Sequence, residues 1–319
     1  MKKASILLLL IIPLLSFAQA KKVFKQALRT TDLKEKISLL TDVIEIEPNN
    51  LDAYFYRALA KNDMGDFGGA IVDYSKIIVE QPDADTYYNR GNSRYSLKDF
   101  KGAKEDFAKA FMLDNTFIDA LYSSGCVKFD LGEYEDAIID FTTILKTDPN
   151  LAHVYTIRAA SYKALENYQK AIYDYNTAIL LEPSIDTFYN RGVFFMDTKY
   201  YLEAKNDFTK VLRAYKSSAY AFFYRGASNL FLGEFPDAIS DFIKALEFDN
   251  KDFDAYLGLA MAYNKINDTN NAIANFEKAN AIISPNDAIN SIEKYINTYW
   301  YQNQYFYFNN SINELTKLK

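Results

Sequence analysis

The sequence predicts an all-α protein, an α-solenoid of stacked antiparallel helical hairpins. An alanine recurs every 33 or 34 residues, and an aromatic residue follows it four positions later. Each period also holds two amphipathic helical patterns, and only 11 glycines and 7 prolines interrupt the 319 residues. A period of this length is typical of a repeat array, which presents a long surface rather than a deep pocket. The alanines are Ala70, Ala103, Ala137, Ala171, Ala204, Ala238 and Ala272, and the aromatic residues are Tyr74, Phe107, Phe141, Tyr175, Phe208, Phe242 and Phe276.

Residues 1–20 are typical of a signal peptide. Lys2-Lys3 supply a positive start, residues 6–15 form an apolar run, and Ala18-Gln19-Ala20 gives a small-x-small cleavage pattern. The apolar run is short for a membrane-spanning helix, although an uncleaved anchor is the alternative interpretation. No cysteine lies near the cleavage site, so we expect no lipoprotein anchor. We therefore expect export to the periplasm or cell envelope of a bacterium, without an integral membrane span.

Each period contains two helices joined by a turn. In residues 51–84 the first pattern runs from about Asp52 to Met64, and the second runs from about Gly68 to Val79. Pro82 ends the second pattern. The break between the two patterns contains a glycine, as the C-terminus of a helix favours. Equivalent glycines are Gly65, Gly132 and Gly233.

The recurring pattern resembles the tetratricopeptide repeat. In residues 118–151 it consists of Leu121, Gly125, Gly132, Tyr134, Ala137, Phe141, Ile144 and Pro149. Seven such repeats occupy residues 51–285 and begin near residues 51, 84, 118, 152, 185, 219 and 253. The resemblance implies a right-handed superhelix of about one turn, with the first helix of each repeat on the concave face.

The segments on both sides of the seven repeats fit the pattern poorly. Residues 21–50 look like a degenerate N-terminal repeat, in which Lys36 replaces the recurring alanine. Residues 286–319 follow a predicted helix start at Ser284-Pro285, and Tyr305 or Phe306 falls at the alanine position. We therefore expect a C-terminal helical cap.

A second period of 101 residues lies on top of the first. The segment 85–91 matches 186–192, and the two 33-residue intervals between alanines are also 101 residues apart. We infer that a block of three repeats was duplicated; chance similarity among related repeats is the alternative. The duplication predicts that the linkers near Ala84 and Ile185 share one backbone path.

The residues that carry chemistry are few. His153 and Cys126 are the only histidine and cysteine, and the chain has no phosphate-binding glycine motif. We expect no catalytic residue, no cofactor and no metal site; a hydrolase is the third alternative. The net charge of −6 and the absence of a long Lys/Arg run argue against nucleic acid as a partner.

An arginine in five first helices is followed sixteen residues later by an aspartate. This spacing spans one helical hairpin, so we expect the two side chains to form an ion pair across it. Whether the pairs are buried stays open, and a basic row that binds anionic peptides is the alternative. The arginines are Arg57, Arg90, Arg158, Arg191 and Arg225, and the aspartates are Asp73, Asp106, Asp174, Asp207 and Asp241.

The partner-binding groove should lie on outward positions of the first helices, which the resemblance places on the concave face. Many of these positions are aromatic, and the alternative is that the rings pack against adjacent repeats. The family's lysine and asparagine motif for a C-terminal carboxylate is not evident, because most first helices begin with an aspartate. The candidate residues are Phe55, Asn62, Tyr88, Asn92, Tyr95, Tyr122, Phe129, Lys163, Tyr189, Met196, Phe223 and Leu230.

These observations predict a non-enzymatic protein–protein interaction scaffold that binds a segment of another protein. The alternative is a structural, self-associating component of a cell-envelope assembly. Exposure of the aromatic segment from Tyr299 to Phe308 would favour self-association, because large apolar patches mark interfaces. The identity of the partner and the oligomeric state are left open.

Overall fold

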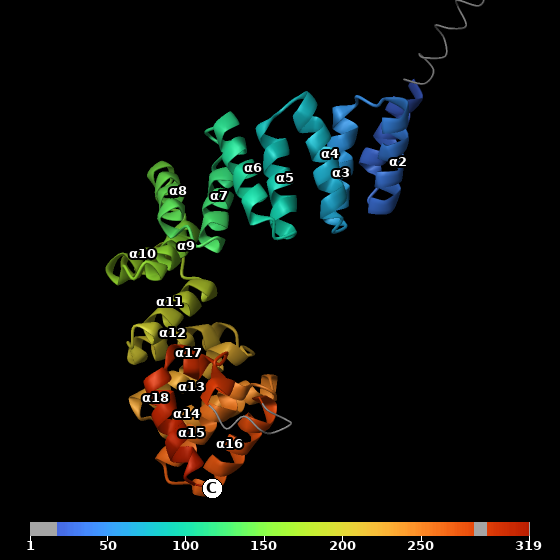
Figure 1. Cartoon of the computed structure of the whole chain (residues 1–319). Coiled ribbons are helices and arrows are strands. Elements are labelled where there is room, and N and C mark those ends of the chain that lie inside the picture. The colour runs from blue at the N-terminus through green and yellow to red at the C-terminus, as the bar shows by residue number, and fades with distance from the viewer. Residues whose placement is uncertain (1–17, 284–291, 319) are drawn as a thin grey trace, which may run out of the picture. The chain divides into compact units, whose positions relative to one another are not determined.

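The computed structural model describes residues 18–283 and 292–318, and every regular element in these ranges is a helix (Figure 1). The predicted class, stacked helix pairs, is confirmed. Contacts divide the chain into two compact units, Met1–Asn150 (unit 1) and Leu151–Lys319 (unit 2). The expected signal peptide lies outside the described residues except for Ala18, Gln19 and Ala20, which belong to a helical segment, residues 18–29.

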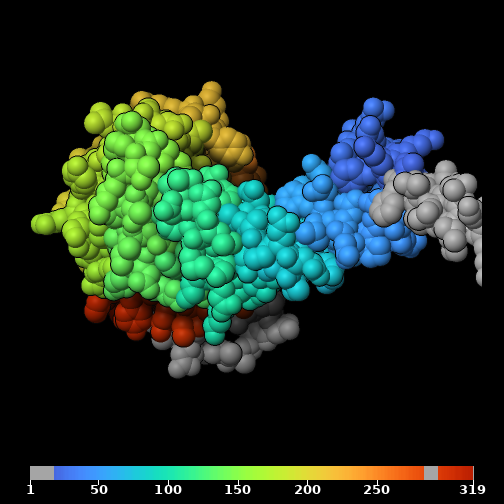
Figure 2. Space-filling view, turned by 90° about the horizontal axis from the view of Figure 1, so that it is seen from above, coloured from blue at the N-terminus to red at the C-terminus, as the bar shows by residue number. Residues whose placement is uncertain are grey.

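Unit 1 continues with seven helices, and consecutive helices lie side by side (Figure 1). Figure 2 shows their surface, coloured from blue to green. Its helices are α2 (Leu33–Ile46), α3 (Leu51–Asp63), α4 (Phe67–Glu80), α5 (Ala84–Ser96), α6 (Phe100–Leu113), α7 (Ile118–Asp130) and α8 (Tyr134–Thr147).

Unit 2 holds four further helix pairs and a C-terminal segment. The pairs are α9 (Ala152–Ala164) with α10 (Tyr168–Leu181), α11 (Ile185–Asp197) with α12 (Tyr201–Ala214), α13 (Ala219–Leu232) with α14 (Phe235–Phe248), and α15 (Phe253–Lys265) with α16 (Thr269–Ile283). The C-terminal segment consists of η1 (Ile292–Tyr295), α17 (Tyr299–Asn303) and α18 (Tyr305–Thr316). The predicted helix start at Ser284-Pro285 lies outside the described residues.

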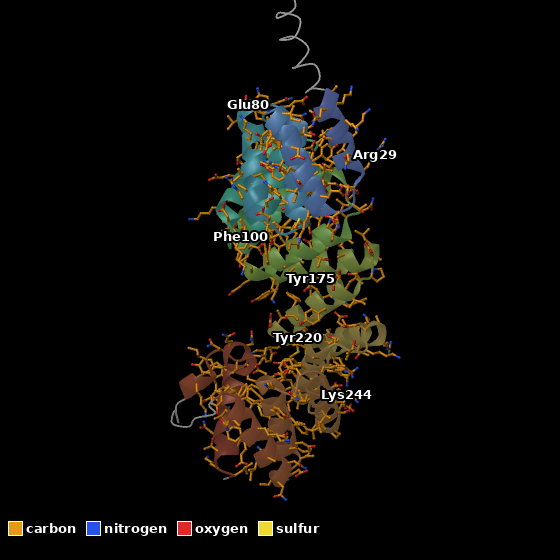
Figure 3. The ribbon with its side chains drawn as sticks, turned by 90° about the vertical axis from the view of Figure 1, so that its right-hand side faces the viewer. Arg29, Glu80, Phe100, Tyr175, Tyr220 and Lys244 are labelled. Carbon is orange, nitrogen blue, oxygen red and sulfur yellow. The ribbon has the colours of Figure 1, made fainter. Side chains whose placement is uncertain are left out.

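The recurring alanines and aromatic residues form the contact inside each helix pair. All seven alanines are 0% exposed, and the aromatic residues, such as Tyr175 in Figure 3, are at most 5% exposed. The ring packs against a small residue of the first helix: a methyl group on Gly125 would lie 2.6 Å from Cε1 of Phe141, and one on Gly91 would lie 2.7 Å from Cε1 of Phe107. Small residues on the first helix therefore serve packing rather than binding.

The turn inside each pair contains one residue with a left-handed backbone. Glycine occupies it in three pairs, with φ near 80° at Gly65, Gly132 and Gly233. In the other four pairs a residue with a side chain adopts the same region, at a cost of about 1–2 kcal/mol each. These residues are Lys98, Glu166, Lys199 and Asn267, with φ between 56° and 64°.

The two short linkers between helix pairs begin and end in similar backbone conformations, as the 101-residue period predicts, although φ differs between Asp83 (−138°) and Ser184 (−100°). Gln81 and Glu182, which end α4 and α10, both have φ of −149°, with ψ of 86° and 102°. Asp83 and Ser184 are extended and cap the following helix, where each accepts a hydrogen bond from a backbone N–H three residues later. The equivalent caps before α3 and α7 have ψ of 88° and 78° instead of 162° and 154°.

Candidate protein-interaction face

Three first helices of unit 1, α3, α5 and α7, form one continuous layer, which follows the helical segment 18–29. Ser93 of α5 donates a hydrogen bond to Asn62 of α3 (3.0 Å). Tyr95 of α5 donates one to Asp130 of α7 (2.6 Å). We call the surface of this layer that faces away from the second helices the first-helix face, and use the same name for α9, α11, α13 and α15 in unit 2.

The predicted aromatic residues of unit 1 are anchored in the core and remain partly accessible. Phe55, Tyr88 and Tyr122 each place their ring centroid 5.7–6.0 Å from the buried ring of their own pair. They are half-buried, as is Phe129, whereas Tyr95 is 40% exposed. The rings therefore both pack against their own helix pair and remain partly exposed. We call these five rings the aromatic floor: Phe55, Tyr88, Tyr95, Tyr122 and Phe129. Asn62 and Asn92 are half-buried beside them.

The five predicted Arg–Asp pairs lie between the two helix layers. In each pair the arginine Nε and Nη2 donate two parallel hydrogen bonds of 2.6–2.9 Å to the carboxylate. The aspartate side chains are 1–6% exposed and the arginine side chains 13–23%. Arg57, Arg90 and Arg191 also donate through Nη1 to the second helix of the preceding pair. The arginines therefore join three helices.

Sequence reasoning missed further cations at the same carboxylates. Lys61 contacts Asp73 at 2.8 Å, Arg94 contacts Asp106 at 3.0 Å and Lys128 contacts Asp140 at 2.6 Å. Each lies twelve residues before its aspartate, a spacing that could have identified them. In the third pair, where serine replaces arginine, Ser124 donates to Asp140 at 2.9 Å.

The prediction that Met196, Phe223 and Leu230 are available to a partner is wrong. They are 0%, 5% and 2% exposed. Phe223 lies under the C-terminal segment, with ring centroids 5.1 Å from Tyr299 and 5.8 Å from Trp300. Figure 1 shows α17 and α18 across α13, α14 and α15.

The C-terminal segment is fixed to the first-helix face by Asp254, the second residue of α15. Its carboxylate accepts hydrogen bonds from the backbone N–H of Tyr299 (3.0 Å) and Trp300 (3.4 Å), at the start of α17. Its carbonyl oxygen accepts another from Nε1 of Trp300 (2.7 Å). Burial raises the pKa of Asp254 to about 6, although the two N–H groups oppose this shift.

The aromatic segment is mainly a cap. Trp300 and Phe308 are 0% exposed, whereas Tyr305 and Phe306 are 41% and 85% exposed. The observation that would have favoured self-association is therefore missing over most of the segment.

The remaining predicted residues of unit 2 have local partners. Lys163 of α9 forms an ion pair with Asp197 of α11. Tyr189 is half-buried, with its ring 5.9 Å from that of Phe208 and 6.0 Å from that of Tyr224. Lys163 therefore joins α9 to α11, and Tyr189 of α11 packs against α12 and α13.

The thiol of Cys126 is a poor candidate nucleophile. Burial raises its pKa to about 11, so it is protonated at neutral pH. In the part of the chain that the structure describes, no three His, Cys, Asp or Glu side chains gather as a metal site would require. No helix in the described ranges is long and apolar enough to cross a membrane.

A tetratricopeptide repeat family model matches residues 84–117, 118–151, 152–185 and 253–286. A comparison with curated proteins found no match. Among solved structures, a tetratricopeptide repeat protein from Parabacteroides merdae ATCC 43184 is 19% identical, with a TM-score of 0.60 over 76% of this chain and 98% of that chain.

Two further structures share the fold. The C-terminal part of a TPR repeat-containing protein from Cytophaga hutchinsonii is 20% identical, with a TM-score of 0.60 over 73% of this chain and 96% of that chain. A chain of the Cut9–Hcn1 hetero-tetramer of APC/C is 20% identical, with a TM-score of 0.54 over 86% of this chain and 53% of that chain. At these identities the likeness concerns the fold alone.

Proposed function

We propose that this chain, a tetratricopeptide repeat protein, is a non-enzymatic scaffold that binds a segment of another protein on its first-helix face. Such repeats generally mediate protein–protein interactions. One chain of the Cut9–Hcn1 hetero-tetramer has a similar fold and is bound to other chains. By analogy, this supports a function in protein binding. The protein acts in the periplasm or cell envelope, a location that the pattern of residues 1–20 supports.

One observation carries the proposal. The C-terminal segment buries Trp300 completely against first-helix residues of unit 2, so the chain itself contains an aromatic helical segment bound to this face. The first-helix face of unit 1 has the same architecture and presents Tyr95 at 40% exposure. A partner segment bound there would gain apolar burial on a floor whose rings are already ordered.

The test is capture of partners from envelope extract by the tagged full-length chain. We expect Tyr95→Ala combined with Phe129→Ala to reduce capture at least tenfold, because rings at interface centres contribute much of the binding energy. Tyr173→Ala is the matched control, since this ring is 67% exposed on the second helix α10. Equal capture by all three proteins would contradict the proposal.

Location is tested separately. N-terminal sequencing of the protein from fractionated cells should find Lys21 as the first residue, in the periplasmic or envelope fraction. Recovery of a chain that begins at Met1 in the cytoplasmic fraction would contradict export.

A further inference from the structure

We infer that the first-helix face of unit 1 binds a basic segment of its partner, one that carries lysine or arginine beside an aromatic side chain. The inference rests on the proposed function and adds the chemistry of the bound segment. Exposed carboxylates line this face of unit 1, and in unit 2 the C-terminal segment contacts the equivalent positions.

Two rows of carboxylates border the aromatic floor. Asp52, Asp85 and Asp119 are the second residues of α3, α5 and α7, and Asp63 and Asp130 are the last residues of α3 and α7. All five are exposed. Among the residues that the structure describes, none of the five forms an ion pair with a cation, although Asp130 accepts the hydrogen bond from Tyr95.

The cations of the same helices are turned away from this face. Each lysine and arginine of α3, α5 and α7 contacts a buried aspartate of a second helix. These cations are Arg57, Lys61, Arg90, Arg94 and Lys128. On this face α3, α5 and α7 therefore carry five negative charges and no positive charge. Such a surface attracts a basic segment and repels an acidic one. The exposed cations of the first helices of unit 1 lie on the preceding helical segment, residues 18–29, and are Lys21, Lys22, Lys25 and Arg29.

Helix stability explains only one of the two rows. A carboxylate in the first turn interacts favourably with the helix dipole, so Asp52, Asp85 and Asp119 stabilise their helices. Asp63 and Asp130 lie at the C-terminal ends, where the same dipole disfavours a negative charge. For Asp130 the hydrogen bond from Tyr95 offsets this cost. For Asp63 no hydrogen bond or ion pair of the described residues does so, and binding of a cation would account for its place.

The equivalent positions in unit 2 show that both rows lie within reach of a bound segment. The second position of α15 is Asp254, which accepts the N–H groups at the positive end of α17. The last position of α15 is Lys265, which pairs with Glu314 of α18 at 3.0 Å. In α13 the position equivalent to Asp130, 101 residues later, is Phe231. Its ring centroid is 6.1 Å from that of Trp300.

Within unit 2 the second residue of the first helix differs between α13 and α15, and only one of the two contacts the C-terminal segment through a carboxylate. In α13 it is Tyr220, 70% exposed and labelled in Figure 3, so the carboxylate contact to α17 comes from α15 alone. In unit 1 the aspartate is present in all three first helices. A segment bound along α3, α5 and α7 would therefore meet a carboxylate at each helix.

The experiment measures binding of a fluorescein-labelled peptide of repeated Lys-Tyr-Lys-Trp units to the full-length chain by anisotropy at low salt. We expect the same peptide with glutamate in place of lysine to bind at least tenfold more weakly. Asp52→Asn/Asp85→Asn/Asp119→Asn should weaken binding of the lysine peptide about tenfold, and the difference should shrink as salt is added.

The matched control is Glu105→Gln/Glu135→Gln/Asp136→Asn, which removes three exposed carboxylates from the second helices α6 and α8 of the same unit. It should leave affinity within twofold. A second variant, Asp63→Asn, should weaken binding while leaving the melting temperature unchanged or higher, which a merely structural carboxylate would not do. Equal affinity for the two peptides, or equal loss in the triple variant and its control, would overturn the inference.

The two proposals fail in different ways. If the full chain captures a partner that is sensitive to Tyr95→Ala/Phe129→Ala but insensitive to the triple aspartate variant, the inference is wrong and the proposed function stands. If capture is insensitive to the aromatic substitutions as well, the proposed function is wrong.

Discussion

At the scale of the residue, the ring on each second helix decides which residues the first helix can carry. A side chain as small as alanine at position 125 would place its methyl group 2.6 Å from Phe141, well inside normal contact. The recurring alanine and ring were visible in the sequence because their spacing is fixed. The sequence could not show how close they approach, because that distance depends on the packing of two helices.

Gly125→Ala should destabilise the chain by about 1–2 kcal/mol, because overpacking costs more than the gain in helix propensity returns. Urea unfolding followed by far-UV circular dichroism measures the change. Gly68→Ala is the control: a methyl group there would meet no atom within 4 Å, so we expect a gain of up to about 1 kcal/mol. A loss of stability in both variants would show that the close approach to Phe141 is not the cause.

The Arg–Asp pairs allow a comparison between two sites. Arg225→Ala leaves the buried Asp241 with only the amide of Asn229 (2.9 Å), so we expect a loss of about 3–5 kcal/mol. Arg90→Ala leaves Asp106 with Arg94 at 3.0 Å, so we expect only about 1.5–3 kcal/mol. Thermal unfolding of the two variants checks the order. If Arg90→Ala costs as much as Arg225→Ala, the second cation does not compensate.

At the scale of the element, periodicity predicted the helices but not the place of the last ones. The helical cap over residues 286–319 was expected because the alanine position is lost there. Its contacts were not predictable, because they join residues 45 and more positions apart, such as Asp254 and Tyr299, and no repeat spacing encodes them. The same reason explains the error at Met196, Phe223 and Leu230, whose positions are equivalent to exposed or half-buried ones in unit 1.

The contact between Asp254 and α17 should depend on pH. The folded chain holds a proton on this carboxyl up to about pH 6, whereas the unfolded chain releases it near pH 3.8. Stability contributed by this group therefore falls as the pH rises from about 4 to 6, by up to about 3 kcal/mol. As the pH rises from about 4 to 6, we expect the melting temperature of the wild type to fall relative to that of Asp254→Asn. A constant difference between the two proteins from pH 4 to 7 would contradict the raised pKa.

At the scale of the whole molecule, the chain consists of two units in which helix pairs mainly contact their neighbours. In such arrays stability is close to a sum of local terms, so parts can unfold separately. Trp300 is the only tryptophan and is fully buried in unit 2, so its emission reports on that unit alone.

We expect the urea transition followed by Trp300 emission to differ from the transition followed by far-UV circular dichroism, which reports helices of both units. Lack of superposition is the expected result, because unit 1 has its own core. Coincident curves would mean that the full chain unfolds in one cooperative step, contrary to the division into units.

The similar backbone conformations of Gln81 and Glu182, and of Asp83 and Ser184, bear on how such a gene can change length. Recombination between the two matching stretches would remove or add 101 residues in frame and join Gln81-Pro82-Asp83 to the helix that now begins at Ile185. The junction would have a loop conformation similar to the two that the protein already adopts. An ancestor or relative could therefore gain or lose three helix pairs in a single event, without evolving a new connection.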